Sequence, residues 1–249
     1  MHNSRPEVLP ADHVVDYRTR VSLKNRFSWI VKYRFSDIFI SSDKDIHDKI
    51  PSSITSFYKD IDKVIESDKP FARSLRPLKA KKYYPEIIKK MCHASSIFDV
   101  GPMASVAGAV CEYLAKDLAG YYDELIIENG GDTLMITDKD PSIGLYVKNK
   151  YFDDSIRLKV TSKEKKVSVC SSSSTFGHSY SEGKCDLAAA FSSSAIYADS
   201  AATSIANKTK EIKDIKKNIK YFSGFEGISG IVIIKENKIG IWGDVELLR

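Results

Sequence analysis

The sequence lacks the signatures of several classes of protein. Its four cysteines include no Cys-x-x-Cys pair, and no histidine pair stands at zinc-finger spacing, so a disulfide framework and a structural zinc site are both disfavoured. No apolar run approaches the length of a membrane span. The first residues contain no apolar segment typical of a secretory signal. We therefore expect a cytoplasmic protein without a membrane partner.

The charge balance disfavours nucleic acid as a partner. The net charge is +5 over 249 residues, and the lysines are scattered rather than gathered into one basic stripe. This mild excess favours small anionic partners such as phosphates. With 43% hydrophobic and 29% charged residues, the composition is that of a globular protein with a real core. Because we find no internal repeat or linker, we expect one domain over residues 1–249.

Strand and helix patterns alternate irregularly along the chain. Period-two alternation predicts a strand at residues 27–35, paired in a hairpin with residues 15–21. Further strands are predicted at residues 38–40, 125–128, 133–137, 143–147, 156–160, 166–170, 231–234 and 239–242. Helical spacing predicts helices over residues 51–65, 84–95, 102–115 and 212–222. Without strict strand–helix–strand alternation, this order predicts an α+β fold in which mixed or antiparallel sheets are packed by helices.

Residues 169–207 have the least ordinary composition. Asp199 and Thr203 stand four apart in an alanine-rich segment, and this spacing puts both oxygens on one face of a helix. Magnesium prefers oxygen ligands and needs few from the protein when water and substrate phosphates complete its shell. The two residues are therefore candidate cation ligands. On spacing alone, however, a carboxylate that complements the helix dipole and a packing threonine is the favoured interpretation.

The serine run just upstream offers further polar groups. Ser173 and Ser174 could present hydroxyl and N–H groups to a phosphate, or only stabilise their own turns. His178 follows a glycine and could act as a base near neutral pH or simply anchor the loop. Cys185 could form a nucleophile pair with His178, but an inert buried thiol is the favoured interpretation.

Two glycine-containing segments could lie against a ligand. Gly101 and Pro102 precede a predicted helix whose N-terminus would favour anions. Small residues along that helix, including Gly108, would admit another backbone or a flat ligand. Asn129-Gly130-Gly131-Asp132 forms a predicted turn between two strands. From the sequence alone, tight helix packing is the favoured interpretation of the first segment, and a Gly-Gly-Asp turn is weak evidence for a ligand.

For two other features, a structural interpretation is favoured over contact with a ligand. The lysine-rich residues 69–82 contain two prolines, so we interpret them as a solvated connector, with contact to a phosphate as the alternative. Cys92 and His93 lie on the next predicted helix. Because no second ligand pair accompanies them, we interpret them as structural residues rather than metal ligands.

At these motifs the chain resembles the ApbE-like superfamily, whose founding activity is FMN transfer from FAD to protein. Within it, the chain is most similar to a compact prokaryotic branch of unassigned function, and the likeness runs from about Tyr17 to Leu248. The stretches that carry it are residues 100–109, 128–132, 177–179, 183–184, 198–207 and 240–247. The resemblance implies an ApbE-like domain.

The resemblance also implies site residues. Asp199 and Thr203 would bind Mg²⁺ together with the backbone carbonyl of Ala104, and His178 matches a shared histidine. The residues that we assign to the FAD or nucleotide site are Gly101, Pro102, Met103, Gly130, Gly131, Asp132, Ser173 and Ser174. A Ser or Thr hydroxyl of an acceptor protein, deprotonated with help from His178, would attack the FMN phosphorus, and AMP would leave.

One departure from the transferases weakens this implication. They carry His-x-x-Asp-Pro, whereas Ser179, Tyr180, Ser181 and Glu182 follow His178 here. Metal binding is therefore a firmer implication than flavin transfer. The sequence leaves open FMN transfer, cleavage of a pyrophosphate, and a non-catalytic flavin- or nucleotide-binding protein. A homo-oligomer is compatible with all three.

Overall fold

The computed structural model describes residues 5–11, 26–139, 141–147, 149–152, 155–161, 164–173 and 184–248. The strand predicted at residues 15–21 lies outside these ranges, as do Ser174 and His178. The described strands form two sheets in which every pairing is antiparallel. The predicted α+β class is confirmed.

The larger sheet has nine strands in the order β1-β2-β3-β4-β5-β8-β9-β10-β11. Their bounds are β1 Glu7–Pro10, β2 Phe27–Tyr33, β3 Ser36–Ser42, β4 Leu125–Asn129, β5 Asp132–Ile136, β8 Lys166–Ser172, β9 Leu187–Ser192, β10 Gly230–Lys235 and β11 Lys238–Gly243. The smaller sheet has the order β12-β7-β6. Its strands are β6 Ser142–Tyr146, β7 Ser155–Val160 and β12 Val245–Leu248.

Five α-helices and three short 3₁₀ segments complete the described structure. The α-helices are α1 Ile50–Ser67, α2 Glu86–Phe98, α3 Val106–Asp117, α4 Ala195–Lys208 and α5 Asp214–Phe222. The 3₁₀ segments are η2 His47–Lys49, η3 Lys69–Ala72 and η4 Pro102–Ser105. No single helix in the described ranges has the length and apolar composition of a membrane span; α2 and Pro102–Asp117 meet both criteria only as a pair bent by 106°.

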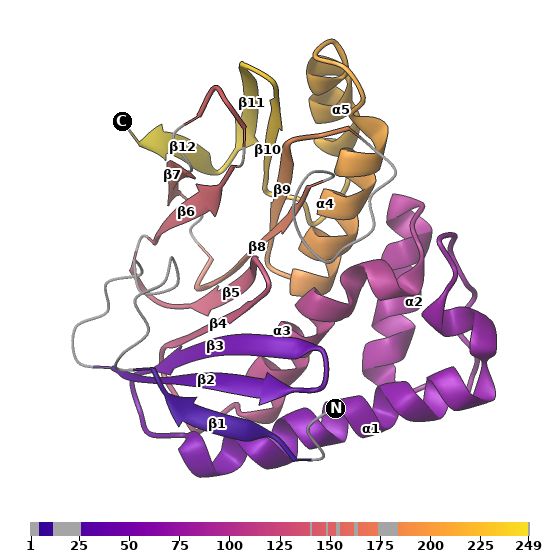
Figure 1. Cartoon of the computed structure of the whole chain (residues 1–249), viewed down its shortest axis with the longest axis vertical. Helices are drawn as coiled ribbons and strands as arrows, with labels where there is room; N and C mark the ends of the chain where they lie inside the picture. Colours follow the sequence, from indigo (N-terminus) through magenta and orange to yellow (C-terminus); the bar gives the residue numbers. More distant parts are fainter. Residues whose placement is uncertain are drawn as a thin grey trace.

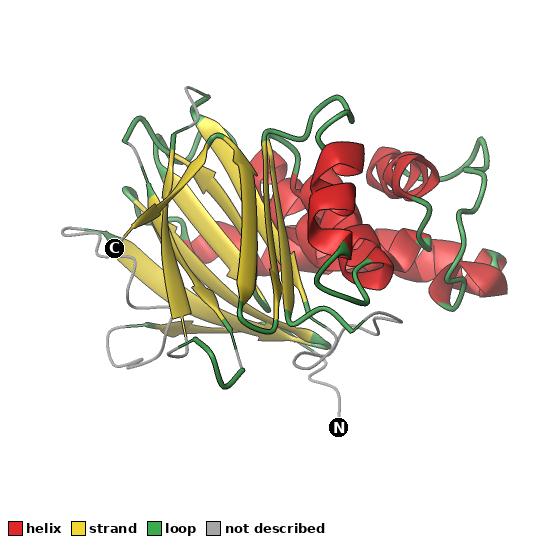
Figure 2. Ribbon diagram, turned by 90° about the horizontal axis from the view of Figure 1, so that it is seen from above, coloured by secondary structure: helices red, strands yellow, loops and turns green. Residues whose placement is uncertain are grey.

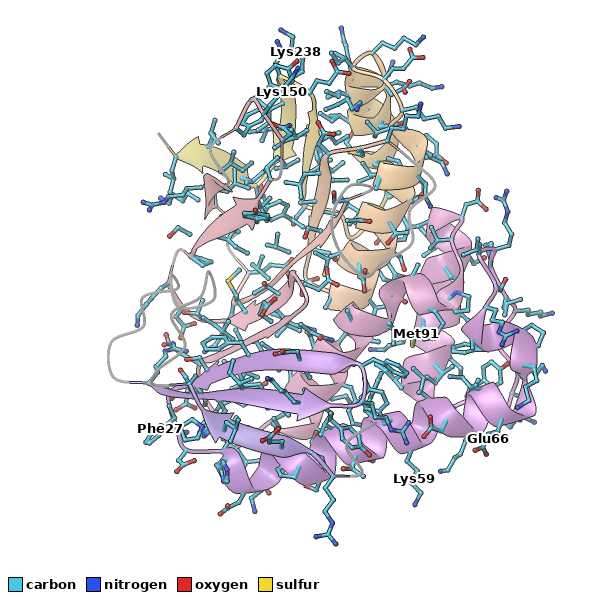
Figure 3. All side chains as sticks on the ribbon, in the orientation of Figure 1. Phe27, Lys59, Glu66, Met91, Lys150 and Lys238 are labelled. Carbon is cyan, nitrogen blue, oxygen red and sulfur yellow. The ribbon has the colours of Figure 1, made fainter. Side chains whose placement is uncertain are left out.

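The helices cover one face of the large sheet, and the small sheet covers part of the other (Figure 2). Apolar side chains from both sheets, such as Val169 and Leu158, form one core between them. On the helical side, α1 runs along the end of the molecule formed by β1–β3 (Figure 1), and Phe57 on α1 packs against Tyr113 on α3. The polar face of α1 is solvated, with Lys59 and Glu66 pointing outward (Figure 3). The amphipathic spacing of α1 thus directs one face inward, as predicted.

One strand boundary differs from the sequence prediction. The alternating pattern predicts that the second strand continues to Phe35, but β2 ends at Tyr33. Arg34 adopts a positive φ of 53°, and Phe35 lies in the turn with 83% of its surface exposed. The apolar alternation therefore continues past the point where the backbone reverses direction into β3. The prediction of a strand to Phe35 is wrong by these two residues.

Candidate cation and nucleotide site

Helix α4 carries the two predicted cation ligands. Its first turn is capped by Ser194, whose side chain accepts a hydrogen bond of 3.4 Å from the Tyr197 backbone N–H. The alanine-rich sequence lets α4 pack closely on its neighbours, and most of its residues are buried. Asp199 and Thr203 lie one turn apart, each with 7% of its surface exposed. Both are thus on the helix and at the spacing that the sequence predicts.

The carboxylate of Asp199 lies at the N-terminus of α3. Its Oδ2 accepts a hydrogen bond of 2.9 Å from the Gly108 backbone N–H. The first N–H groups of any helix have no partner within the helix, and the N-cap residue of α3, Ser105, makes no side-chain capping bond. Asp199 therefore provides for α3, from another helix, the negative group that a helix N-terminus favours.

Gly108 allows this contact because it has no side chain. A Cβ at this position would overlap the backbone carbonyl of Ala195 and lie 3.0 Å from the Cβ of Asp199. The backbones of α3 and α4 thus cross at Gly108 with no room for even a methyl group. The predicted run of small residues on α3 serves helix packing here, and this packing brings the Asp199 carboxylate to the helix terminus.

The Gly-Pro segment before α3 also contacts α4. Ala104 donates its backbone N–H to the Gly101 carbonyl at 3.0 Å, which closes the 3₁₀ turn η4. The Ala104 side chain packs against the apolar cluster that contains Ala201 and Ala202 of α4. Gly101 is fixed by packing of its own, since a Cβ there would overlap the Ser74 carbonyl. The structure therefore places Ala104 beside the helix that carries Asp199 and Thr203.

The Gly-Gly-Asp turn joins β4 and β5 as predicted. Gly130 and Gly131 have positive φ values of 66° and 102°, as in the two-residue turns that favour glycine at both positions. The N–H of Gly131 donates to Oε1 of Glu128 at 2.7 Å. Oδ1 of Asp132 accepts from the Ser171 N–H at 3.0 Å, which ties the turn to β8. These bonds tie the turn to its neighbours and hold Asp132 at the start of its strand.

Asp132 and Asp199 form a pair of buried carboxyl groups that repel each other. Burial raises the pKa of Asp132 well above its ordinary value, and the negative charge of Asp199 raises it further. Burial also raises the pKa of Asp199 to about 7, although the N–H groups of Gly108 and Ala107 act in the opposite direction. Within the described ranges, no lysine or arginine forms an ion pair with either carboxylate. In the described part of the chain, the two acidic groups thus have no protein cation to balance them.

The thiols near the site are buried and inert. Cys111 donates to the Asp132 carbonyl at 3.6 Å, and Cys170 donates to the Ala195 carbonyl at 3.5 Å. Burial raises the pKa of both thiols well above the ordinary value, and the neighbouring carboxylates raise it further. Burial likewise raises the pKa of Cys185 to about 12. A thiol held in its protonated form is a poor nucleophile, so the structure favours the inert interpretation of Cys185.

The structure brings three distant motifs to one place: η4 with α3, the Gly-Gly-Asp turn, and α4. Ser173 directly follows β8, two residues after Ser171, which holds Asp132.

Sequence reasoning missed Glu128, a buried carboxylate that raises the pKa of Asp132 and fixes the turn. Its only sequence signal is its position two residues before the glycine pair. No group of three or more His, Cys, Asp or Glu residues in the described part of the chain is arranged to hold a metal, so any cation here needs hydroxyl, carbonyl and substrate oxygens as well.

Comparison with known proteins identifies the relatives of this chain. The family model described as "AbpE bacteria" matches residues 18–219. The chain belongs to this family. The UPF0280 protein MJ1526 of Methanocaldococcus jannaschii is 35% identical over 213 residues, which are 83% of this chain and 86% of that protein. The UPF0280 protein MK0206 of Methanopyrus kandleri is 31% identical over 224 residues, which are 87% of this chain and 90% of that protein.

Solved structures of ApbE proteins share the fold. The ApbE protein of Thermotoga maritima superposes with a TM-score of 0.56 at 13% identity, and covers 98% of this chain and 97% of its own. The flavin transferase ApbE from Vibrio cholerae superposes with a TM-score of 0.56 at 9% identity, and covers 84% of this chain and 94% of its own. At such low identity the likeness establishes an ApbE-like fold. Together with the match to the family model, this shared fold confirms the predicted membership of the ApbE-like superfamily.

Proposed function

We propose that this chain binds Mg²⁺ through the Asp199 carboxylate, the Thr203 hydroxyl and the Ala104 carbonyl, and that this cation holds the diphosphate of FAD or a related nucleotide. The observation that carries the proposal is the buried Asp199 carboxylate at the N-terminus of α3, beside a second buried carboxylate and without a basic partner in the described residues.

The residues present fit a hard divalent cation. A carboxylate, a hydroxyl and a carbonyl are all oxygen donors, which Mg²⁺ prefers, and Mg²⁺ usually takes one or two carboxylates and completes its shell with water and phosphate. Mutual repulsion between Asp132 and Asp199 would fall in the presence of a positive ion. The bond to Gly108 occupies only part of the acceptor capacity of Asp199, since a carboxylate has about four lone-pair sites.

The other residues of the site position the nucleotide. Gly130 and Gly131 have no side chains, so the backbone of the Gly-Gly-Asp turn can lie flat against a ring system. Asp132 is fixed by the Ser171 N–H and would direct a polar carboxyl group toward the nucleotide. Ser173 would offer a hydroxyl to a phosphate. Mg²⁺, when bound, would neutralise the diphosphate charge and polarise the phosphorus for attack.

The reaction that we propose is FMN transfer from FAD to a Ser or Thr hydroxyl of an acceptor protein. The flavin transferase from Vibrio cholerae has the same fold and supports this choice. His178 is proposed as the base that takes the proton from the acceptor hydroxyl, and AMP is the leaving group. Cleavage of the FAD pyrophosphate by water uses the same residues. The alternative is a non-catalytic flavin- or nucleotide-binding protein, which the rewritten segment after His178 favours.

One incubation separates these outcomes. The chain, FAD and Mg²⁺ are mixed with and without a Ser/Thr-containing acceptor, and AMP is quantified by chromatography while protein mass is recorded. We expect AMP to form with wild type and Ser200→Ala, and to be abolished in Asp199→Ala. A flavin adduct on the acceptor indicates transfer, and AMP with free FMN indicates hydrolysis. Saturable quenching of flavin fluorescence without AMP would establish the non-catalytic alternative. The absence of both quenching and AMP would refute the proposed site.

A further inference from the structure

Two sequence features that the proposed function does not use meet in the fold. The lysine-rich connector passes over α2 at the position of Cys92 and His93. Between them lies a cavity of about 530 Å³ that is open to solvent, since Lys79, His93 and Ser96 of its lining are exposed. Its lining residues are Pro77, Leu78, Lys79, Ala80, Lys89, Cys92, His93 and Ser96. None of them belongs to the candidate cation and nucleotide site.

The lining has separate apolar and polar parts. Leu78 and Ala80 pack against the core cluster that contains Cys92, and they form the apolar part. The polar part comes from Lys79 on the connector and from α2, where Lys89 and His93 are one turn apart. These groups are two ammonium donors and an imidazole, and no carboxylate lines the cavity. The chemistry of the lining therefore favours an anion.

Unlike their neighbours, the two lysines of the cavity have no counter-ion among the residues that the structure describes. Lys81, two residues after Lys79, pairs with Asp68 at 2.8 Å, and Lys90 pairs with Glu112 at 3.2 Å. Neither Lys79 nor Lys89 forms an ion pair within the described ranges. Two like charges thus face one cavity, and none of the described carboxylates compensates them.

The connector is held in place at both ends of the cavity. On one side Arg76 pairs with Asp99 at the end of α2, at 3.7 Å. On the other side Asp68 receives both the Lys81 ammonium and the Tyr84 hydroxyl. Residues 77–80 therefore form a strap whose two ends are fixed to the helices. A ligand between the strap and α2 would meet a backbone already in place, which lowers the ordering cost of binding.

We propose that this strap cavity binds a small phosphate monoester. A dianionic phosphate matches the two uncompensated ammonium groups of Lys79 and Lys89, and His93 and Ser96 add hydrogen-bond donors. The apolar surface of Pro77, Leu78 and Ala80 accommodates the organic part. For Lys79, this proposal takes up the alternative interpretation of residues 69–82, a contact with a phosphate, in place of a purely solvated connector.

The test uses inorganic phosphate and phenyl phosphate as probes, with EDTA present so that no divalent cation can retain phosphate at Asp199. Binding is followed by calorimetry on the full chain. We expect phenyl phosphate to bind at one site, and Lys79→Gln with Lys89→Gln to weaken it at least about tenfold, as expected when charge-assisted hydrogen bonds are lost. The matched control, Lys69→Gln with Lys82→Gln, removes two exposed connector lysines outside the cavity and should change affinity by less than about twofold.

A second readout locates the ligand. The imidazole carbon and proton signals of His93 should shift on addition of phenyl phosphate in wild type and in the control pair, and should stay fixed in the cavity pair. Equal weakening in both lysine pairs would show non-specific attraction and would overturn the proposal. So would a failure of phenyl phosphate to saturate, or His93 signals that do not move. Because EDTA removes the cation, none of these results depends on the proposed FAD site.

Discussion

The Asp199 carboxylate accepts a 2.9 Å hydrogen bond from the backbone N–H of Gly108, 91 positions earlier in the chain. This bond joins the alanine-rich helix α4 to the N-terminus of α3. It therefore gives Asp199 a structural role and fixes the position of the carboxylate that we propose as a cation ligand. The two roles can be separated by experiment, because only one of them depends on added metal.

Substitution of Gly108 tests the close contact between α3 and α4. An alanine Cβ would overlap the Ala195 carbonyl, so Gly108→Ala must push the helices apart. We expect a loss of about 1–3 kcal/mol in the free energy of unfolding, as for other overpacked positions. Gly144→Ala is the matched control, because no atom lies within 4 Å of its added Cβ, and its effect should be within about 0.5 kcal/mol. Urea unfolding compares them; equal effects would contradict the packing interpretation.

The stability of the metal-free protein should depend on the protonation of Asp199. Burial raises its pKa to about 7, whereas an unfolded aspartate titrates at about 3.9. The folded state therefore binds more protons between these values, so this stabilisation is complete below about pH 4 and is lost as the pH rises to about 7.

Asp199→Asn should remove that dependence. We expect wild-type unfolding free energy in EDTA to fall more steeply from pH 5 to pH 7 than that of the variant, by at most about 1.4 kcal/mol per pH unit for one group. Asp117→Asn, at an exposed position on α3, should keep the wild-type slope. Identical slopes in wild type and Asp199→Asn would show that the carboxyl group titrates normally.

Glu112 should contribute more to stability than the lysine with which it pairs. Its Oε2 accepts from the Ser194 hydroxyl at 2.7 Å and its Oε1 from Lys90 at 3.2 Å, so it links α2, α3 and the cap of α4. Glu112→Ala removes both bonds from a buried position, and we expect a loss of about 1–3 kcal/mol. Lys90→Ala should cost less than about 1 kcal/mol, because 47% of the lysine side chain is exposed. Thermal or urea unfolding shows which variant loses more stability. A larger loss in Lys90→Ala than in Glu112→Ala would rule out a bridging role for Glu112.

The sequence predicted the elements whose pattern is local. The hairpins β4–β5 and β10–β11 were predictable because turn residues separate two apolar runs. Strand β9 was missed because all six residues of Leu187–Ser192 are buried, so no alternation marks it, and its small side chains also suit a helix. Strands β1 and β12 have only four residues each, too few for a period to stand out.

The candidate site was predictable in composition and not in geometry. The spacing of Asp199 and Thr203 correctly placed them on one helix, and the Gly-Gly-Asp turn was predicted with its flanking strands. The bonds from Gly108 to Asp199 and from Ser171 to Asp132 join positions 91 and 39 residues apart, and no local pattern records such partners. Burial of two carboxylates together, with the resulting rise in pKa, also depends on the assembled fold.

Titration with Mn²⁺, followed by loss of the free-ion paramagnetic signal, tests the central claim most directly, since Mn²⁺ takes the same oxygen ligands as Mg²⁺. In the presence of FAD, wild type and Ser200→Ala should bind one ion per chain. Asp199→Asn and Thr203→Val should each bind it at least about tenfold more weakly, which corresponds to about 1.4 kcal/mol per variant. Undiminished binding in both variants, or no binding by the wild-type chain, would contradict a cation site at these residues.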